Sequence, residues 1–232
     1  MSGLAAFPAE AAGDSERWFA RRCRKTAAFN DLTTIATVVS NRRSRATLVA
    51  RETGVVCGLP LALEAFRLLD AKATVRIEHE DGARVEGRRA GAVRDRTRAR
   101  AVVGGACRAE LHAAAVGHRD ADVRDTSMRC AAPNAKILDT RKTTPGWRAL
   151  EKYAVRAGGG TNHRMDLSTG VLIKDNHLAA LDGDVAKAVR ARATSRRPGV
   201  KIEVECDRVE QVERARRTPA PTSFSSTTCR PR

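Results

Sequence analysis

Aromatic residues are scarce in this chain of 232 residues, where they make up only 3% of the composition. None occurs between Gly91 and Pro133. Proteins that bind single-stranded nucleic acid stack the bases on aromatic side chains, so this absence argues against a nucleic-acid partner for that segment. Hydrophobic residues still amount to 42%, which is enough for a core.

Long apolar runs are also missing. No stretch approaches the roughly 20 apolar residues that cross a bilayer, so no membrane span is expected. Residues 1–14 have neither a basic start nor an apolar run of the signal-peptide type. The six cysteines include no C-x-x-C pair, and we interpret them as free thiols in a reducing compartment. These features predict a cytoplasmic location.

Charge of one sign is in excess: 43 Lys and Arg against 27 Asp and Glu give a net charge of +16. Such a surplus is typical of proteins that bind polyanions, which keeps a basic nucleic-acid-binding protein as one alternative. Arginine is frequent from about Gly91 to Pro133, where leucine is nearly absent and neither a period of two nor one of 3.6 is found. A disordered basic linker is one explanation of this segment, and a displaced reading frame is another.

A regular pattern follows the arginine-rich segment. Short apolar pieces at 136–139, 171–173 and 200–206 are predicted to be strands, the first of them buried, and helical patterns separate them. The first helix is predicted to be capped by Thr144, to carry Pro145 in its first turn and to stop at three glycines, and the second spans 184–196. The apolar face of the first helix is predicted to consist of Leu150, Tyr153, Ala154 and Ala157. The strands recur at nearly even intervals of the length of a β/α unit, which predicts a parallel sheet or barrel.

The N-terminal part has a different order of elements. We predict a helix at 15–25, a loop at 31–34, strands at 46–50 and 55–58, and a helix at 61–69. The pieces 74–78 and 83–87 flank Asp81-Gly82, a strong signal for a hairpin. This order of elements suits a small α/β domain.

Charged residues gather where the predicted parallel strands end, and this is the edge at which barrel enzymes place their active sites. The candidate site residues at these ends and in the segment between them are Arg141, Lys142, His163, Arg164, Lys174 and Glu205. Five cations and one carboxylate would fit a multiply anionic substrate with phosphate or carboxylate groups.

Each of these residues has an ordinary interpretation when it is taken alone. A lysine or arginine after a strand is more often a solvated loop residue, and a lone histidine is more often a packing or surface residue. His163 and His177 lack metal-ligand spacing to each other or to a cysteine, so we predict no zinc site and assign no metal ligand. The combination, and not any single residue, predicts an enzyme.

The sequence blocks DTRKTTPG, LEKYAV, GGGTNHR, LIKDNH and KIEVE resemble those of the quinolinate phosphoribosyltransferases in order and spacing. The resemblance is dense from Lys136 to about Arg214, and a weaker one covers 31–34, 50–54 and Gly58. It implies an α/β fold, an N-terminal α/β sandwich followed by an incomplete parallel α/β barrel. The corresponding divisions are an N-terminal domain at 15–103, a disrupted or disordered linker at 104–135, a partial catalytic barrel at 136–217 and an irregular tail at 218–232.

The resemblance implies a pentosyltransferase of de novo NAD biosynthesis. Its reaction joins quinolinate to phosphoribosyl pyrophosphate, giving nicotinate mononucleotide, pyrophosphate and carbon dioxide, with Mg²⁺ accompanying the pyrophosphate and a homodimer as the assembly. By this resemblance Arg141, His163, Arg164 and Lys174 bind the substrate carboxylates. Lys142 contacts phosphate and Glu205 lies near the ribose, so that the catalytic residues are Lys142, Lys174 and Glu205.

Two features of that family are missing from the letters of this chain: an arginine-bearing helix that ends in a serine-glycine turn, and the last barrel strands. Residues 110–119 can be encoded by a string that reads N-F-M-Q-R-L-S-G-I-A in a neighbouring frame, and residues 221–230 similarly allow D-L-V-L-L-D-N-M-P. We therefore interpret the chain as frame-disrupted and expect weak or no turnover as written. The alternatives are an inactive relic that still binds quinolinate, and a sister family associated with molybdenum transport loci.

Overall fold

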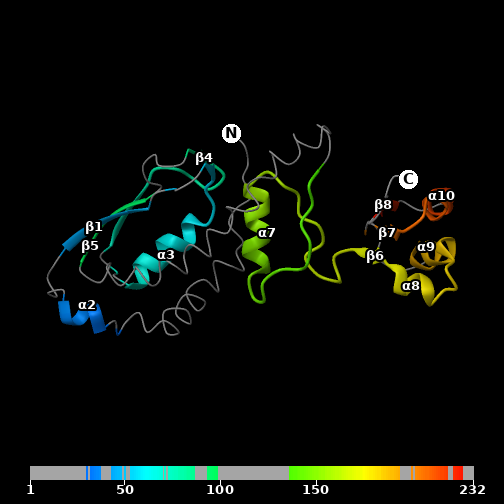
Figure 1. The fold of residues 1–232 in the computed structure, drawn as a ribbon, viewed down its shortest axis with the longest axis horizontal. Coiled ribbons are helices and arrows are strands. Elements are labelled where there is room, and N and C mark those ends of the chain that lie inside the picture. Colours follow the sequence, from blue (N-terminus) through cyan, green and yellow to red (C-terminus); the bar gives the residue numbers. More distant parts are fainter. Residues whose placement is uncertain are drawn as a thin grey trace. The chain divides into compact units, whose positions relative to one another are not determined.

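The computed structural model describes residues 30, 32–37, 43–48, 50, 53–69, 71, 73–86, 93–98, 136–193, 200, 202–218 and 222–226. The chain divides into two compact units, residues 1–163 and 164–232, and each is described by itself (Figure 1). The predicted helix at 15–25 and the predicted linker at 104–135 lie outside the described residues. No helix in the described part of the chain has the length and apolar character needed to cross a membrane.

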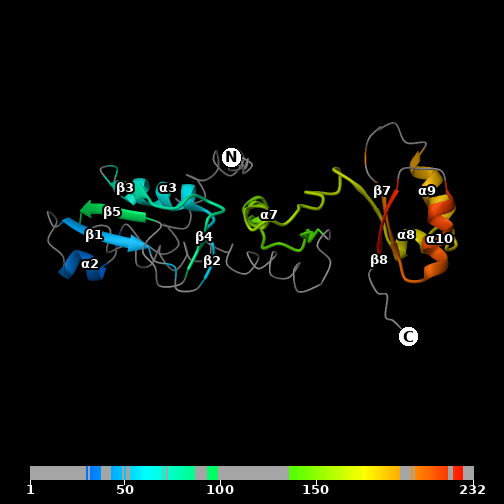
Figure 2. The ribbon, with the colours of Figure 1, turned by 90° about the horizontal axis from the view of Figure 1, so that it is seen from above.

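The first unit combines antiparallel strands with helices. Its described elements are α2 (Leu32–Thr37), β1 (Arg43–Leu48), β2 (Gly54–Val55), α3 (Leu59–Leu69), β3 (Thr74–Ile77), β4 (Arg84–Val85), β5 (Val93–Arg98) and α7 (Arg148–Ala157). The longer strands form an antiparallel sheet in the order β1-β5-β3, and α3 runs along it (Figure 2). Leu59 and Phe66 of α3 are buried in a cluster that also includes Val75 of β3, so the helix and sheet share a small core.

The central strand β5 lies in a stretch where the sequence showed no period. It pairs with β1 from Arg43↔Arg98 to Leu48↔Val93 and with β3 from Thr74↔Arg96 to Ile77↔Val93. Hydrogen bonding to a neighbour on each side defines this strand, and partners so distant in sequence leave no local signal. The predicted loop at 31–34 was also wrong, because α2 begins at Leu32. Its threonines have low helix propensity, which explains the error.

The predicted hairpin around Asp81-Gly82 is wrong in its pairing, although the turn itself is present. β3 pairs with β5, whereas β4 pairs with β2 through Gly54↔Val85 and Val55↔Arg84. The Asp81 carboxylate accepts the backbone N–H groups of Gly58 (2.9 Å) and Leu59 (3.0 Å) at the start of α3. These two hydrogen bonds hold the Asp81-Gly82 turn against the start of α3. The strands on either side of the turn, β3 and β4, therefore belong to different sheets.

Helix α7 begins later than predicted and without the predicted cap. Thr144 does not cap it, because Pro145 and Gly146 form a turn that is closed by Trp147 N–H donating to Thr144 O at 2.9 Å. Gly146 has φ +77°, the value that the third position of a type II turn requires. The helix ends at Ala157, and the three glycines that follow it confirm the predicted stop.

The predicted buried strand at 136–139 is reduced to an isolated parallel bridge between Leu138 and Thr161, and Leu138 is 50% exposed. Tyr153, Ala154 and Ala157 are buried together with Cys57, which confirms the predicted apolar face of α7. This packing joins α7 to the first unit, which extends to His163.

The second unit is built from parallel β/α units, as predicted. Its described elements are β6 (Val171–Ile173), α8 (Asp175–Ala179), α9 (Val185–Ala193), β7 (Ile202–Cys206), α10 (Val209–Arg217) and β8 (Thr222–Ser226). The strands lie in the order β6-β7-β8 and both pairings are parallel. All three helices lie on one face of the sheet (Figures 1 and 2). The buried core between them includes Val185, Val189 and Val204, each with 0% exposure.

The predicted irregular tail at 218–232 is wrong where the structure describes it. Thr222–Ser226 forms β8, which pairs with β7 from Ile202↔Thr222 to Cys206↔Ser226. The letters TSFSS contain one large apolar side chain, so alternation could not reveal a strand, and pairing with β7 determines it.

Candidate active site

The six candidate residues are divided between the two units. Arg141, Lys142 and His163 belong to the first unit, whereas Arg164, Lys174 and Glu205 belong to the second. The geometry of each group is therefore described separately. In the first unit, all three residues lie in the segments that precede and follow α7.

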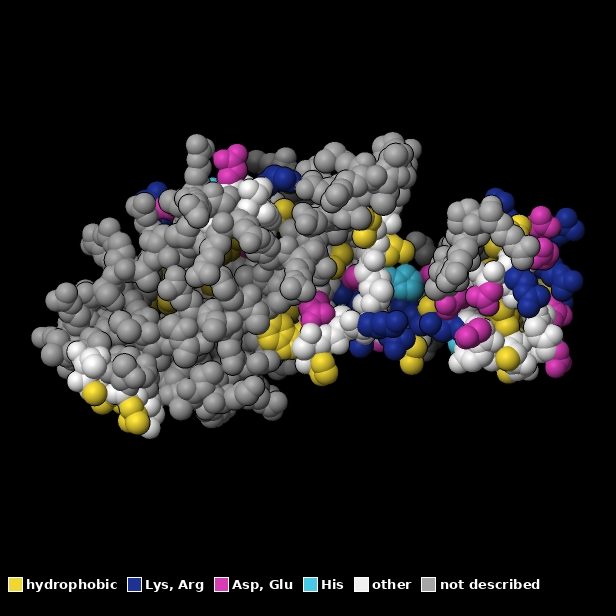
Figure 3. All heavy atoms as spheres, in the orientation of Figure 1, with side chains coloured by type: hydrophobic (Ala, Val, Ile, Leu, Met, Phe, Trp, Pro, Cys, Tyr) yellow, Lys and Arg dark blue, Asp and Glu magenta, His cyan; other side chains and the backbone are white. Residues whose placement is uncertain are grey.

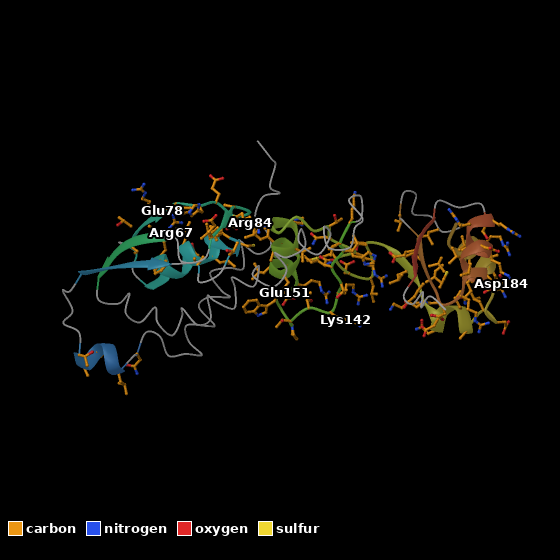
Figure 4. All side chains as sticks on the ribbon, turned by 45° about the horizontal axis from the view of Figure 1, so that its top comes forward. Arg67, Glu78, Arg84, Lys142, Glu151 and Asp184 are labelled. Atoms are coloured by element: carbon orange, nitrogen blue, oxygen red, sulfur yellow. The ribbon has the colours of Figure 1, made fainter. Side chains whose placement is uncertain are left out.

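The loop that carries Arg141 and Lys142 is fastened to the first turns of α7. Arg148 donates from Nη2 to the carbonyl oxygen of Arg141 (3.3 Å) and from Nε to Thr143 Oγ1 (3.2 Å). One turn along the helix, Glu151 Oε1 accepts the backbone N–H of Thr144 at 3.1 Å. Figure 4 shows Lys142 on this loop and Glu151 on the adjacent helix. These contacts fix the backbone from which the two cations project.

The Arg141 side chain has an unsatisfied donor. Its Nε is buried and has no hydrogen-bond partner, the one such side-chain atom within the described ranges. Leaving a buried donor unpaired costs about 1–3 kcal/mol, and the cost is higher for a charged group. Lys142 beside it is exposed. An anionic ligand that accepts from the Arg141 guanidinium would remove this cost.

A buried ion pair joins α7 to the segment before it, and the same two side chains hydrogen-bond to the segment after it. Lys152 Nζ lies 2.5 Å from Asp139 Oδ1, and the side chains are 3% and 7% exposed. Asp139 Oδ1 also accepts the backbone N–H of His163 (2.8 Å), and Oδ2 accepts Asn162 Nδ2 (2.5 Å). Lys152 Nζ donates as well to the carbonyl oxygen of His163 at 3.3 Å.

These three network residues were not among the predicted site residues. Asp139, Lys152 and Asn162 stand inside the quoted blocks, but no role was assigned to them. A signal was available: a lysine directly beside the predicted apolar face of a helix, and an aspartate at the end of an apolar piece, each need a partner when buried. The sequence could not show that the two partners are each other.

In the second unit, the structure brings Lys174 and Glu205 together. Lys174 follows β6 and Glu205 lies in β7, and the parallel register Ile173↔Val204 places the two residues side by side at the carboxyl ends of their strands. Lys174 Nζ is 3.4 Å from Glu205 Oε2, and the side chains are 45% and 23% exposed. The predicted position at the strand ends is therefore confirmed for this pair.

Alternation along β7 explains why its carboxylates remain accessible. Ile202, Val204 and Cys206 face the core, while Glu203 and Glu205 occupy the other face and are half-buried. Burial, with Asp207 second, raises the pKa of the Cys206 thiol. Burial therefore disfavours the reactive thiolate form of the Cys206 thiol, which lies next to Glu205 and is 2% exposed.

Local contacts hold the predicted residue Arg164, and also His177, which was not predicted as a site residue. Arg164 Nη1 donates to the carbonyl oxygen of Gly170 at 3.2 Å, which braces the segment that leads into β6. His177 Nδ1 accepts the backbone N–H of Lys174 at 2.9 Å, so this histidine caps α8. Figure 3 shows that basic and acidic side chains are mixed on the visible face of this unit. Lys174 and Glu205 are thus distinguished by their place at the strand ends and not by charge alone.

Comparison with known proteins identifies two family models along the chain. Residues 31–93 match the quinolinate phosphoribosyl transferase N-terminal domain, and residues 121–221 match the C-terminal domain. A nicotinate-nucleotide pyrophosphorylase [carboxylating] of Mycobacterium leprae is 40% identical over 196 residues, which cover 79% of this chain and 64% of the relative. A probable enzyme of the same name from Bacillus subtilis is 36% identical, over 80% of this chain and 63% of its own length. The chain therefore spans about three fifths of the length of these curated relatives.

Solved structures agree with the sequence comparison. NadC from Streptococcus pyogenes superposes with a TM-score of 0.69 at 30% identity, covering 82% of this chain and 68% of that chain. The nicotinate-nucleotide pyrophosphorylase from Francisella tularensis gives a TM-score of 0.73 at 26% identity, covering 87% of this chain and 70% of that one. The fold and the motif blocks therefore point to the same relatives.

Proposed function

Because the chain belongs to the quinolinate phosphoribosyltransferase family, we propose that it serves phosphoribosyl transfer to quinolinate in NAD biosynthesis. The ring nitrogen of quinolinate attacks the anomeric carbon of phosphoribosyl pyrophosphate, and the bond to pyrophosphate breaks. The bond to the 2-carboxylate then breaks, carbon dioxide leaves, and the electron pair that remains on the ring carbon takes up a proton. Every reactant is an anion, so the work of the protein is to bind, orient and neutralise charge.

One observation carries the proposal: the buried Nε of Arg141, which has no partner, on a loop that α7 holds in place. A planar guanidinium is suited to a carboxylate, because its donors form a fork that matches the two oxygens. We assign Arg141 and His163 to the quinolinate carboxylates. The exposed Lys142 is assigned to the phosphate groups.

The second unit is assigned the sugar and the remaining carboxylate contacts. Glu205 provides a carboxylate for the positive charge that develops on the ribose, while Lys174 and Arg164 provide cations for quinolinate. Burial on one side of β7 leaves Glu205 only 23% exposed, which strengthens its field relative to that of a fully solvated carboxylate.

Mg²⁺ is proposed to enter with phosphoribosyl pyrophosphate and to neutralise the leaving pyrophosphate. Magnesium at such sites is held by one or two carboxylates together with substrate phosphates, and Glu203 and Glu205 on one face of β7 are donors of this type.

A homodimer is proposed from the family, to be checked by sedimentation. A cytoplasmic location is proposed from the free, buried thiols of Cys57 and Cys206.

The test is to follow pyrophosphate release by the purified chain with quinolinate, phosphoribosyl pyrophosphate and Mg²⁺, together with calorimetric titration of quinolinate alone. We expect quinolinate to bind, and Arg141→Lys to weaken that binding roughly 10- to 100-fold, because one charge-assisted hydrogen bond is lost. Arg67→Lys, on the exposed side of α3, is the matched control and should bind normally.

The two measurements separate the possible outcomes. Binding accompanied by quinolinate-dependent pyrophosphate release supports the full reaction. Binding without release identifies the inactive alternative, in which the binding residues remain without turnover. Absence of both would overturn the proposed function.

A further inference from the structure

A gain in the stability of the fold does not explain why Asp139 and Lys152 form a buried ion pair. Both side chains are almost fully buried, at 7% and 3% exposure. Taking two charges out of water is costly, and replacing such a pair by uncharged groups of similar volume is often neutral or stabilising. The role of this pair therefore lies in the segments of the chain that its two side chains hold in place.

The pair holds two segments that carry three of the candidate site residues. Asp139 precedes Arg141 and Lys142 in the same loop, so fixing its carboxylate fixes the start of that loop. Both backbone groups of His163 are bound by the pair: its N–H by Asp139 at 2.8 Å and its carbonyl by Lys152 at 3.3 Å. The two segments are 24 residues apart in sequence and meet at one carboxylate.

Asn162 completes the arrangement. Its Nδ2 donates to Asp139 Oδ2 at 2.5 Å and to the Lys152 carbonyl at 2.8 Å, while its Oδ1 accepts Arg156 Nη1 at 2.8 Å. Among the described residues, the Asp139 carboxylate accepts from three donors: an ammonium, a backbone N–H and an amide N–H. A carboxylate satisfies all three with its two oxygens, whereas an amide at this position would offer a single acceptor oxygen.

We propose that the pair of Asp139 and Lys152, completed by Asn162, is a positioning device that sets Arg141, Lys142 and His163 in the geometry needed to bind an anionic substrate. The inference rests on the proposed function, which takes these three residues as substrate contacts. Neither Asp139 nor Lys152 needs to touch the substrate, because both act through the backbone of the segments that they fix. A displacement of about 1 Å in such segments can cost up to 100-fold in activity.

The experiment uses the full chain with the double substitution Asp139→Asn and Lys152→Met, which removes both charges and keeps side-chain size. The matched control is Tyr153→Phe. This change removes the partly buried hydrogen bond from Tyr153 Oη to Asp81 Oδ2 (2.8 Å), one residue along the same helix, from a side chain that packs in the cluster with Cys57. Three quantities are measured: the thermal midpoint, backbone amide hydrogen exchange, and the dissociation constant of quinolinate.

In the double variant we expect faster exchange of the amides of residues 141–144 and of His163, and a quinolinate dissociation constant raised about 10- to 100-fold. In Tyr153→Phe we expect a lower thermal midpoint, with those amides and that constant unchanged. If the double variant does not fold, Asn162→Ala replaces it. That change keeps the ion pair, removes the donor to Asp139 Oδ2, and should shift the same amides in the same direction by a smaller amount.

Wild-type exchange and wild-type affinity in a folded double variant would overturn the inference. Equal shifts in Tyr153→Phe would also overturn it, because the effect would then be one of general stability. A wild-type chain that binds no quinolinate would contradict the proposed function instead, and hydrogen exchange at residues 141–144 and His163 would still decide whether the pair positions them.

Discussion

Asp81 and Asp139 each collect hydrogen-bond donors from segments that are far apart in sequence. Asp81 accepts from the start of α3 and from Tyr153 Oη on α7. The side chains around it are buried: burial, with the Asp81 carboxylate second, raises the pKa of Cys57 to about 12. Burial followed by the hydrogen bond to Asp81 likewise raises the pKa of Tyr153. Two carboxylates thus tie α7 to its surroundings through the consecutive residues Lys152 and Tyr153.

Lys174 offers a test at the residue scale because its ion pair with Glu205 is partly solvated. Exposed pairs contribute about 1 kcal/mol or less, so Lys174→Met should change the free energy of unfolding by no more than that. Quinolinate affinity should nevertheless fall, since the site loses a cation. Urea unfolding and calorimetry measure the two effects. Lys187→Met, an exposed lysine of α9, should leave both unchanged, and an equal loss of affinity there would contradict the assignment of Lys174.

At the scale of elements, Gly160 follows α7 at a position where any side chain would clash with the helix. A Cβ on Gly160 would lie 2.6 Å from Val155 Cγ1 and 3.1 Å from Val155 O. The glycine lets the chain pass close over the end of α7, where Gly160 N–H donates to Val155 O at 2.8 Å. The segment that carries His163 can then return toward Asp139.

We predict that Gly160→Ala lowers the free energy of unfolding by about 1–3 kcal/mol, because the added methyl group overpacks against Val155. Gly170→Ala is the control: the nearest atoms to its Cβ would be at 3.7 and 3.8 Å, an ordinary contact distance. Denaturant unfolding of both variants checks this. Equal stability of the two would show that the backbone around Gly160 relaxes at little cost.

Helix α9 begins with a carboxylate that titrates. Asp184 Oδ1 accepts the backbone N–H of Lys187 at 3.0 Å, and that hydrogen bond is the main cause that lowers the Asp184 pKa. A group whose pKa is lower in the folded state stabilises the fold above its unfolded pKa, and the stabilisation disappears as the pH falls through the folded pKa.

Asp184→Asn keeps a capping oxygen without the charge. The stability advantage of the wild type over this variant should be constant near neutral pH and should shrink below about pH 4, where an unperturbed aspartate begins to bind protons. Thermal midpoints of both proteins across pH 3–7 measure this. An advantage that does not depend on pH would show that the charge of Asp184 has no part in it.

At the scale of the whole molecule, the net charge of +16 favours the binding of polyanions, an effect that is separate from catalysis. The surplus is spread along the chain, and the arginine-rich segment 91–133 lacks aromatic residues for stacking. Such charge binds polyanions without sequence preference, through the release of counterions.

Any affinity for duplex DNA should therefore fall steeply with salt. The logarithm of the binding constant should decrease against the logarithm of the salt concentration with a slope of roughly −0.9 per phosphate neutralised. Fluorescence anisotropy with two unrelated duplexes over a salt series tests this. Binding that persists at high salt and prefers one duplex would instead favour the alternative of a nucleic-acid-binding protein.

The sequence by itself determined the β/α order of residues 171–206, the glycine stop of α7 and the place of Lys174 and Glu205 at strand ends, because hydrophobic period and turn chemistry are local properties. Only the tertiary structure decided that β5 and β8 are strands, that the Asp81 turn serves α3 instead of closing a hairpin, and that Lys152 lies against Asp139. In each case the deciding partner is distant along the chain. A buried backbone group without a hydrogen bond and a buried charge without a partner each destabilise the folded state. The contacts that satisfy these groups are made between segments far apart in the sequence, so no local pattern encodes them.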